Sequence, residues 1–255
     1  MLLPHERADD LLRNNLKIIQ ADDVFSFSMD AVLLARFCSV PPRGRIMDLC
    51  TGNGVVPMLL STRTQAEIWG LEIQERLADM AARSVQLNGL EERIHIEQGD
   101  LKEYRTREAS LFDLVTVNPP YLPVCAGEQN GNLHFAAARH EIFCTLEDVL
   151  AACSRLTRYG GKVAMVHRPA RLTDILEGMR RAGLEPKRLR FVHPKAEQEA
   201  NMVLVEGIRG GKPDLRLLPP LVVYGPDGQY TGELMEVYYG SADSLRVENK
   251  ERGSE

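Results

Sequence analysis

Residues 45–60 read RIMDLCTGNGVVPMLL. The first five residues are mostly apolar and predict a short buried strand, and residues 55–60 predict a helix. Gly52 and Gly54 lie between them, and glycine lets the backbone approach a ligand closely. A strand, a glycine-rich turn and a helix in this order form the nucleotide-binding unit of a doubly wound α/β sheet. The spacing disfavours a nicotinamide dinucleotide, because Pro57 stands where the third glycine of that fingerprint is expected.

Two further strands are predicted downstream, and each leads to an acidic residue. Residues 67–72 end on Glu72, and residues 93–97 are followed closely by Asp100. Ligands of open α/β sheets bind at the carboxyl ends of the strands, so both carboxylates are expected at one edge. There Glu72 can accept hydrogen bonds from the two ribose hydroxyls of a nucleoside, and Asp100 from an adenine amino group. Asp48 is expected either to hold the amides of the glycine turn or to touch the cofactor.

A third set of candidate residues follows the strand predicted over residues 112–117. That strand stops on Asn118-Pro119-Pro120-Tyr121. Each proline fixes φ and removes an N–H, so the chain leaves the strand as a stiff edge. Such an edge can grip a planar group that carries an exocyclic NH2. The side-chain oxygen of Asn118 and the carbonyl of Pro119 would accept its two hydrogens at about 3 Å, and Tyr121 would stack on its ring.

Together these motifs resemble those of class I S-adenosylmethionine-dependent methyltransferases, and within them the bacterial tRNA1(Val) adenine-N6-methyltransferase family. Residues 25–35 (FSFSMDAVLLA), 138–141 (ARHE) and 230–233 (YTGE) support the narrower resemblance, which spans about residues 15–240. It implies S-adenosyl-L-methionine as the cofactor. It also implies methyl transfer to the N6 amino group of the adenine 3′ of the anticodon in a valine tRNA, with Asn118 bordering both cofactor and substrate.

Four further residues are weaker candidates. Phe27 and Asp30 precede or begin a predicted helix and are expected to line the methionine end of the cofactor; core packing and helix capping are the alternatives. Pro120 and His140 are expected to contact the substrate, and the alternative for His140 is a structural pairing with its neighbour Glu141.

Positive charge is concentrated in one part of the chain. The net charge is −5, but residues 155–195 contain eleven Lys or Arg and only three Asp or Glu. Arg180, Arg181 and Arg188 belong to the densest group, and we predict that they contact RNA phosphates. A solvated helix and loop surface is the alternative.

The order of predicted elements indicates an α/β protein with a Rossmann-like, seven-stranded, mostly parallel sheet and helices on both faces. The last two strands, residues 187–192 and 200–208, are too close for a helical crossover and predict an antiparallel hairpin. Residues 45–240 would form the methyltransferase domain. Residues 1–44 would be a lead-in packed on the cofactor site, helical over its first 14 residues, and residues 241–255 a disordered tail.

The long segment at residues 122–145 is predicted to be a loop that orders around the substrate. No apolar run is long enough for a membrane span, and the first residues lack the apolar core of a signal peptide. The five cysteines are scattered, without C-x-x-C spacing, so free thiols and no metal site are expected. These features predict a cytoplasmic enzyme.

Alternatives to an RNA adenine methyltransferase stay open at this point. A release-factor glutamine N5-methyltransferase uses the same Asn-Pro-Pro-Tyr edge, but such enzymes usually carry an N-terminal helical domain for which residues 1–44 are too short. A ribosomal RNA base methyltransferase is a second rival. A cofactor-binding module that helps RNA to fold is the non-enzymatic alternative, although it has no use for an intact Asn-Pro-Pro-Tyr. Structured RNA is favoured over duplex DNA because bases in RNA loops are already partly unstacked.

Overall fold

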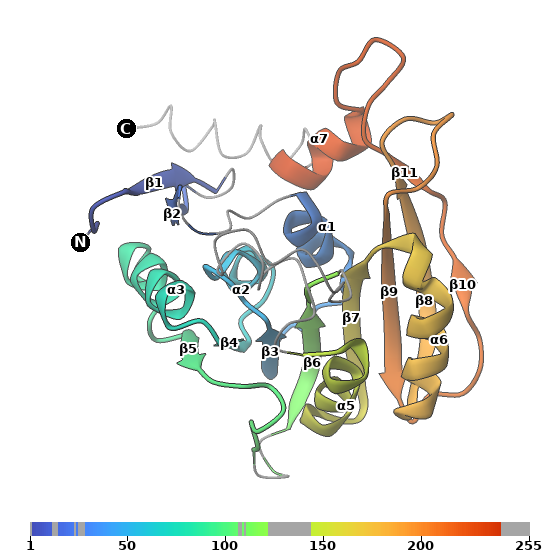
Figure 1. The fold of residues 1–255 in the computed structure, drawn as a ribbon, viewed down its shortest axis with the longest axis horizontal. Helices are drawn as coiled ribbons and strands as arrows, with labels where there is room; N and C mark the ends of the chain where they lie inside the picture. Colours follow the sequence, from blue (N-terminus) through green and yellow to red (C-terminus); the bar gives the residue numbers. More distant parts are fainter. Residues whose placement is uncertain are drawn as a thin grey trace, which may run out of the picture.

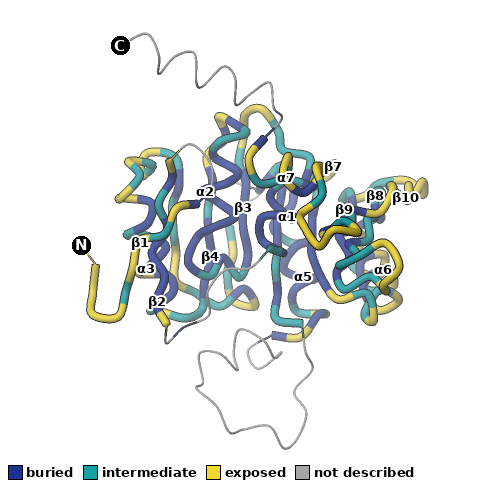
Figure 2. The backbone as a smooth tube through the Cα atoms, turned by 90° about the horizontal axis from the view of Figure 1, so that it is seen from above, coloured by how far each residue is buried: buried dark blue, intermediate teal, exposed yellow. Residues whose placement is uncertain are grey.

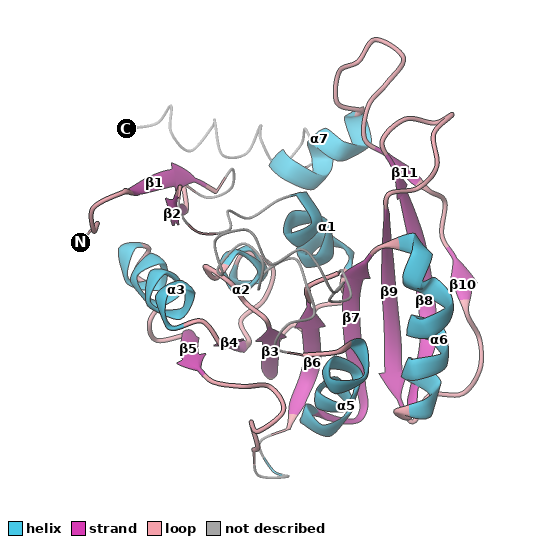
Figure 3. Ribbon diagram, viewed as in Figure 1, coloured by secondary structure: helices cyan, strands magenta, loops and turns pink. Residues whose placement is uncertain are grey.

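The computed structural model describes residues 2–11, 15–22, 24, 29–106, 109, 111–121 and 144–240. Their centre is one twisted sheet flanked by helices (Figures 1 and 3). Its seven main strands follow the order β8-β9-β7-β6-β3-β4-β5. Their bounds are β3 Arg45–Leu49, β4 Glu67–Glu72, β5 Ile94–Gln98, β6 Phe112–Val117, β7 Thr157–His167, β8 Leu184–His193 and β9 Met202–Arg209.

The sheet confirms the predicted mixed topology. Strand β9 is antiparallel to both β7 and β8, which makes the predicted C-terminal hairpin, and the pairings between β7, β6, β3, β4 and β5 are all parallel. Two short strands, β10 (Arg216–Leu217) and β11 (Leu221–Val222), also pair with β8. These two were not predicted, because a two-residue strand is too short to show a period-2 pattern.

Helices cover both faces of the sheet because side chains alternate along each strand. Ile46 and Leu114 pack in one core with α1 (Met29–Phe37) and α2 (Val55–Ser61). Their neighbours Met47 and Val115 pack in the other core with α5 (Leu146–Leu156) and α6 (Leu172–Arg181). The other helices within the described residues are α3 (Glu75–Leu87), the 3-10 turn η2 (Pro169–Arg171) and α7 (Gly232–Tyr239). Figure 2 shows that the central strands are buried while the outer faces of the helices are exposed.

The helical lead-in predicted over residues 1–14 is wrong. Strand β1 (Glu6–Asp10) instead forms an antiparallel hairpin with β2 (Lys17–Ala21), which lies on α3. Strand β1 has no apolar alternation that would identify it, since its sequence is ERADD. Pairing with β2 and a bidentate ion pair between Arg83 and Glu6, at 2.7 Å for each contact, hold it in place.

Two predicted segments lie outside the described residues: the predicted tail at residues 241–255, and the predicted substrate loop apart from residues 144 and 145. The parallel strands β3 to β7 all end at one edge of the sheet, called the carboxyl edge below. Helix α7 packs on α1 above this edge (Figure 1).

Candidate active site

The glycine turn follows β3 directly and has an uncommon backbone. Cys50, Gly52 and Gly54 all have positive φ, at 56°, 56° and 87°. A Cβ on Gly54 would also lie 3.1 Å from the Cβ of Ala81 in α3, so a larger residue there would be crowded as well as conformationally strained. Cys50 is the informative case, because a non-glycine residue seldom adopts this conformation and such residues concentrate at functional sites.

Asp48 ties the turn to the neighbouring strand. It is buried, and its carboxylate accepts hydrogen bonds from Thr51 Oγ1 at 2.7 Å and Thr116 Oγ1 at 2.6 Å. Burial raises the pKa of Asp48 to about 7 in spite of these two bonds. Of the two roles predicted for Asp48, the observed contacts favour holding the turn, through threonine hydroxyls rather than through backbone amides.

Glu72 is fixed by the backbone around it. Its Oε2 accepts from the Gly52 N–H at 2.9 Å and its Oε1 from the Gln74 N–H at 3.0 Å, and its side chain is buried. Burial raises the pKa of Glu72, and the hydrogen bonds from the amides oppose this effect. Each carboxylate oxygen has a second lone pair, so the same group can still accept from ligand hydroxyls.

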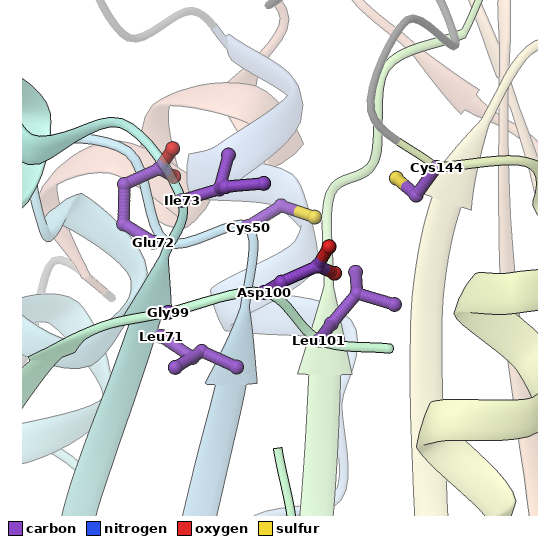
Figure 4. A pocket seen from close by; sticks show the side chains of 8 residues that line it. All are labelled: Cys50, Leu71, Glu72, Ile73, Gly99, Asp100, Leu101 and Cys144. Carbon is purple, nitrogen blue, oxygen red and sulfur yellow. The ribbon is translucent and has the colours of Figure 1, made fainter. Parts of the chain in front are cut away.

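A pocket at the ends of β3, β4 and β5 contains both predicted carboxylates (Figure 4). Asp100 follows β5 and accepts from the Lys102 N–H at 2.8 Å. The lining is otherwise apolar or sulfur-containing, and consists of Cys50, Leu71, Ile73, Gly99, Leu101 and Cys144 together with Glu72 and Asp100. Apolar walls suit an adenine ring, and the two carboxylates suit the ribose hydroxyls and the adenine amino group. The chemistry of this lining therefore agrees with the adenosine-binding role predicted for Glu72 and Asp100.

The Asn-Pro-Pro-Tyr edge lies one strand away from the glycine turn. Strand β6 pairs with β3 up to Val117 opposite Leu49, so Asn118 and Cys50 follow neighbouring strand ends. The hydroxyl of Tyr121 lies 2.6 Å from Asp30 Oδ2 and also hydrogen-bonds Asn118 Oδ1. The structure thus brings Asp30 of α1 to the predicted catalytic residues.

Two residues at the end of β7 were missed by the sequence analysis. The ring of His167 packs edge-on against Tyr121, with ring centres 5.1 Å apart, and the guanidinium of Arg168 lies 5.1 Å from the centre of the Tyr121 ring. His167 is buried, which lowers its pKa to about 4, and its Nδ1 accepts from the Arg168 N–H at 2.8 Å. Their position at the carboxyl end of a predicted parallel strand was the signal that could have found them.

The predicted arginine group does not join the rest of the site. Arg188 makes an internal ion pair, 3.1 Å from the buried Glu206, and donates to Ser39 Oγ at 2.8 Å. Arg180 and Arg181 end α6 just before β8 begins, so they lie at the opposite edge of the sheet from Asn118. Both pair with glutamates there. These arginines therefore do not lie together beside Asn118, and their contact with RNA phosphates stays a prediction. Phe27 and His140 lie outside the described residues.

A pocket with two carboxylates and a proline-braced edge share one end of a parallel sheet, and this arrangement is that of a class I S-adenosylmethionine-dependent methyltransferase. The family model of the methyltransferase small domain matches residues 15–169, and the chain belongs to this family. Its cofactor is S-adenosyl-L-methionine, which supplies an electrophilic methyl group when bound. No helix within the described ranges is long and apolar enough to span a membrane.

Curated relatives carry a narrower name. The tRNA1(Val) (adenine(37)-N6)-methyltransferase of Aeromonas salmonicida (strain A449) is 32% identical over 178 residues, which are 69% of this chain and 73% of the relative. The enzyme of the same name from Erwinia tasmaniensis is 28% identical over 207 residues, which are 79% of this chain and 82% of the relative.

Solved structures share the fold. A predicted O-methyltransferase from Agrobacterium tumefaciens has 25% identity and a TM-score of 0.66, covering 83% of this chain and 96% of its own. A geranyl diphosphate C-methyltransferase from Streptomyces coelicolor A3(2), solved with S-adenosyl-L-homocysteine, has 11% identity and a TM-score of 0.53, covering 71% and 78%. At such low identity the second likeness concerns the fold alone.

Proposed function

We propose that this methyltransferase modifies the N6 amino group of an adenine in structured RNA, and that the target is the adenine 3′ of the anticodon in a valine tRNA. The observation that carries the proposal is Asn118-Pro119-Pro120-Tyr121 at the end of β6, beside the strand that leads into the cofactor pocket. The names of the relatives from Aeromonas salmonicida and Erwinia tasmaniensis support the choice of tRNA.

Methyl transfer to an adenine amino group requires the edge residues to free the lone pair of the nitrogen and to hold the nitrogen in position. The lone pair of an adenine amino nitrogen is delocalised into the ring, so the nitrogen is a poor nucleophile. If Asn118 Oδ1 and the Pro119 carbonyl accept its two hydrogens, the nitrogen becomes more pyramidal and its lone pair is freed. Two prolines hold these acceptors rigidly, and such positioning supplies much of the rate acceleration in reactions of this kind.

The hydroxyl of Tyr121 must release Asn118 when the base arrives. A phenol carries one hydrogen and donates it to one oxygen at a time. A base that takes the Asn118 oxygen would leave the Tyr121 hydroxyl donating to Asp30, which already lies 2.6 Å away. Asp30 therefore gives Tyr121 a second partner, so that the exchange leaves no buried hydroxyl unpaired.

Glutamine N5-methylation is the rival activity, since a glutamine amide is also planar and carries an NH2. The test supplies the purified enzyme and labelled S-adenosylmethionine with total tRNA in one reaction and with release factor in another. Methylated tRNA is then digested to nucleosides and analysed by mass spectrometry. We expect N6-methyladenosine in the valine tRNA fraction. Label in release factor, with none in RNA, would overturn the assignment.

A further inference from the structure

Four tyrosines gather in the C-terminal part of the described chain. Tyr224, Tyr230 and Tyr238 form a stacked column: the ring centres of the first two are 5.2 Å apart, and those of the last two are 6.2 Å apart with an interplanar angle of 9°. Tyr239 lies beside Tyr238, with ring centres 6.3 Å apart. Tyr224, Tyr230 and Tyr239 are 36%, 45% and 39% exposed. We call Tyr224, Tyr230 and Tyr238 the tyrosine column.

The local structure shows how the column is held. Tyr224 and Tyr230 face each other across an antiparallel bridge that is closed by a tight turn. The next residue, Thr231, donates from its hydroxyl to the Val222 carbonyl at 2.6 Å and accepts from the Leu234 N–H as the cap of α7. Tyr230-Thr231-Gly232-Glu233, a segment singled out by its sequence, is thus the junction that fixes the column to α7.

The tyrosine column begins near the Asn-Pro-Pro-Tyr edge. Helix α7 packs on α1, which carries Asp30, the partner of Tyr121 (Figure 1). Tyr238 is the inner end of the column, because it packs against the core around α1 and α2. Burial, then the neighbouring Tyr230 and then the charge of Asp30 raise the pKa of Tyr238 to about 12. Tyr230 and then Tyr224 continue the column from there, and both are partly exposed.

We propose that the tyrosine column is the surface on which nucleotides next to the target adenine stack. This inference rests on the proposed function, because it takes the substrate to be RNA. Bases stack on exposed aromatic rings with little regard to sequence. Among the described residues, the ring of Tyr224 contacts no aromatic ring other than that of Tyr230, so a base can extend the column at this end. An unpaired RNA loop fits this position because its bases are free to splay apart once one of them enters the catalytic site.

The test compares ring loss with hydroxyl loss. Tyr224→Leu and Tyr230→Leu remove a flat ring but keep apolar bulk, whereas Tyr224→Phe and Tyr230→Phe keep the ring. Binding of the anticodon stem-loop of valine tRNA is measured by fluorescence anisotropy. We expect each leucine variant to bind it about 5-fold or more weakly. The phenylalanine variants should bind as the wild type does, and all four should keep the wild-type affinity for S-adenosylmethionine.

Tyr159 provides a matched control. Its side chain is 76% exposed. It lies at the start of β7, at the end of the sheet opposite the carboxyl edge. Tyr159→Leu should leave RNA binding unchanged. RNA affinities of Tyr224→Leu and Tyr230→Leu equal to that of the wild type would overturn the inference.

A measurement on the unaltered enzyme covers the case of a variant that fails to fold. Stem-loops with 5-iodouridine on either side of the target adenine are irradiated with the wild-type protein, and the cross-linked residues are identified by mass spectrometry. Cross-links to Tyr224 or Tyr230 support the inference, and cross-links confined to other residues contradict it. A wild-type enzyme that methylates no RNA would refute the proposed function. An enzyme that methylates RNA without using these tyrosines would refute this inference alone.

Discussion

The two halves of the carboxyl edge are built by different means. In the cofactor half, at β3 and β4, backbone amides hold the carboxylate of Glu72, and the turn has left-handed backbone conformations that few sequences allow. In the substrate half, at β6 and β7, side chains hold one another: the Tyr121 hydroxyl bonds Asp30 and Asn118, and its ring meets His167 and Arg168. Backbone contacts suit a pocket that always binds the same cofactor. Side-chain contacts can be exchanged when a substrate arrives.

The largest expected effect is in the substrate half. Asn118→Ala removes one acceptor of the amino hydrogens, and loss of one such positioned group typically costs a factor of about 10² to 10³ in kcat. We expect a loss of this size in methyl transfer to RNA, measured with tritiated cofactor. Cofactor affinity, measured by calorimetry, should be little changed. Unchanged turnover would remove Asn118 from the mechanism.

The second-largest effect, a loss of cofactor affinity, is expected from a substitution in the cofactor half. Glu72→Ala leaves the Gly52 and Gln74 amides without their acceptor and removes the carboxylate from the pocket. Hydrogen bonds to a charged group contribute about 1.5–3 kcal/mol, so the Kd for S-adenosylmethionine should rise about 10- to 100-fold. The kcat at saturating cofactor should stay close to that of the wild type. A fall in kcat with unchanged cofactor affinity would mean that the two halves are not separate in function.

A smaller loss of kcat is expected when the exchangeable side-chain contacts of Tyr121 are removed. Tyr121→Phe keeps the ring but removes the hydroxyl that reaches Asp30 and Asn118. We expect kcat to fall about 5- to 10-fold, since a partly buried partner left unpaired costs an amount at the lower end of about 1–3 kcal/mol. Asp30→Asn should have a smaller effect, and the double variant should lose no more than Tyr121→Phe alone. Additive losses would show that Asp30 acts independently, for example by binding the cofactor.

The smallest expected effect concerns stability rather than catalysis. The folded-state pKa of Asp48, about 7, lies above its ordinary value of 3.8. The folded protein therefore keeps a proton that the unfolded chain releases, so this group's contribution to stability falls as pH rises from about 4 to about 7 and is constant above that range. His167, with its lowered pKa, acts in the opposite direction below pH 6.5.

Asp48→Asn isolates the contribution of Asp48, because the variant keeps the size of the side chain and cannot titrate. Urea unfolding at several pH values should show the variant gaining stability relative to the wild type as pH rises through this window, on the order of 1–4 kcal/mol. A constant difference between the two proteins across the window would mean that Asp48 is ionised throughout.

Sequence patterns predicted the cofactor half better than the substrate half, and the reason is physical. A glycine turn and an acid at a strand end are local features, and parallel strands bring them together without further information. The contacts of Tyr121 with Asp30 and His167 join residues far apart in the chain, and no local pattern reports them. The arginine group illustrates the same limit: its composition is visible, but the buried Glu206 that pairs with Arg188 comes from another strand.

The local sequence pattern also led to a wrong prediction at the N-terminus, where a helix was expected. The polar sequence of β1 has no period, and its conformation depends on pairing with β2 and on the ion pair between Glu6 and Arg83 of α3. The mostly parallel sheet with its C-terminal antiparallel hairpin was predictable, the hairpin because connection length alone excludes a parallel crossover there.

The two shortest strands have a consequence for how the protein behaves at high concentration. Without them, β8 would be a ten-residue outer strand with unsatisfied backbone groups, which invites pairing with other chains. Strand β10 covers β8 at Arg188 and Leu189, and β11 covers it at Val192 and His193. The segment that ends in α7 thus shields this rim of the sheet, and a chain cut after β9 should aggregate more readily than the whole protein.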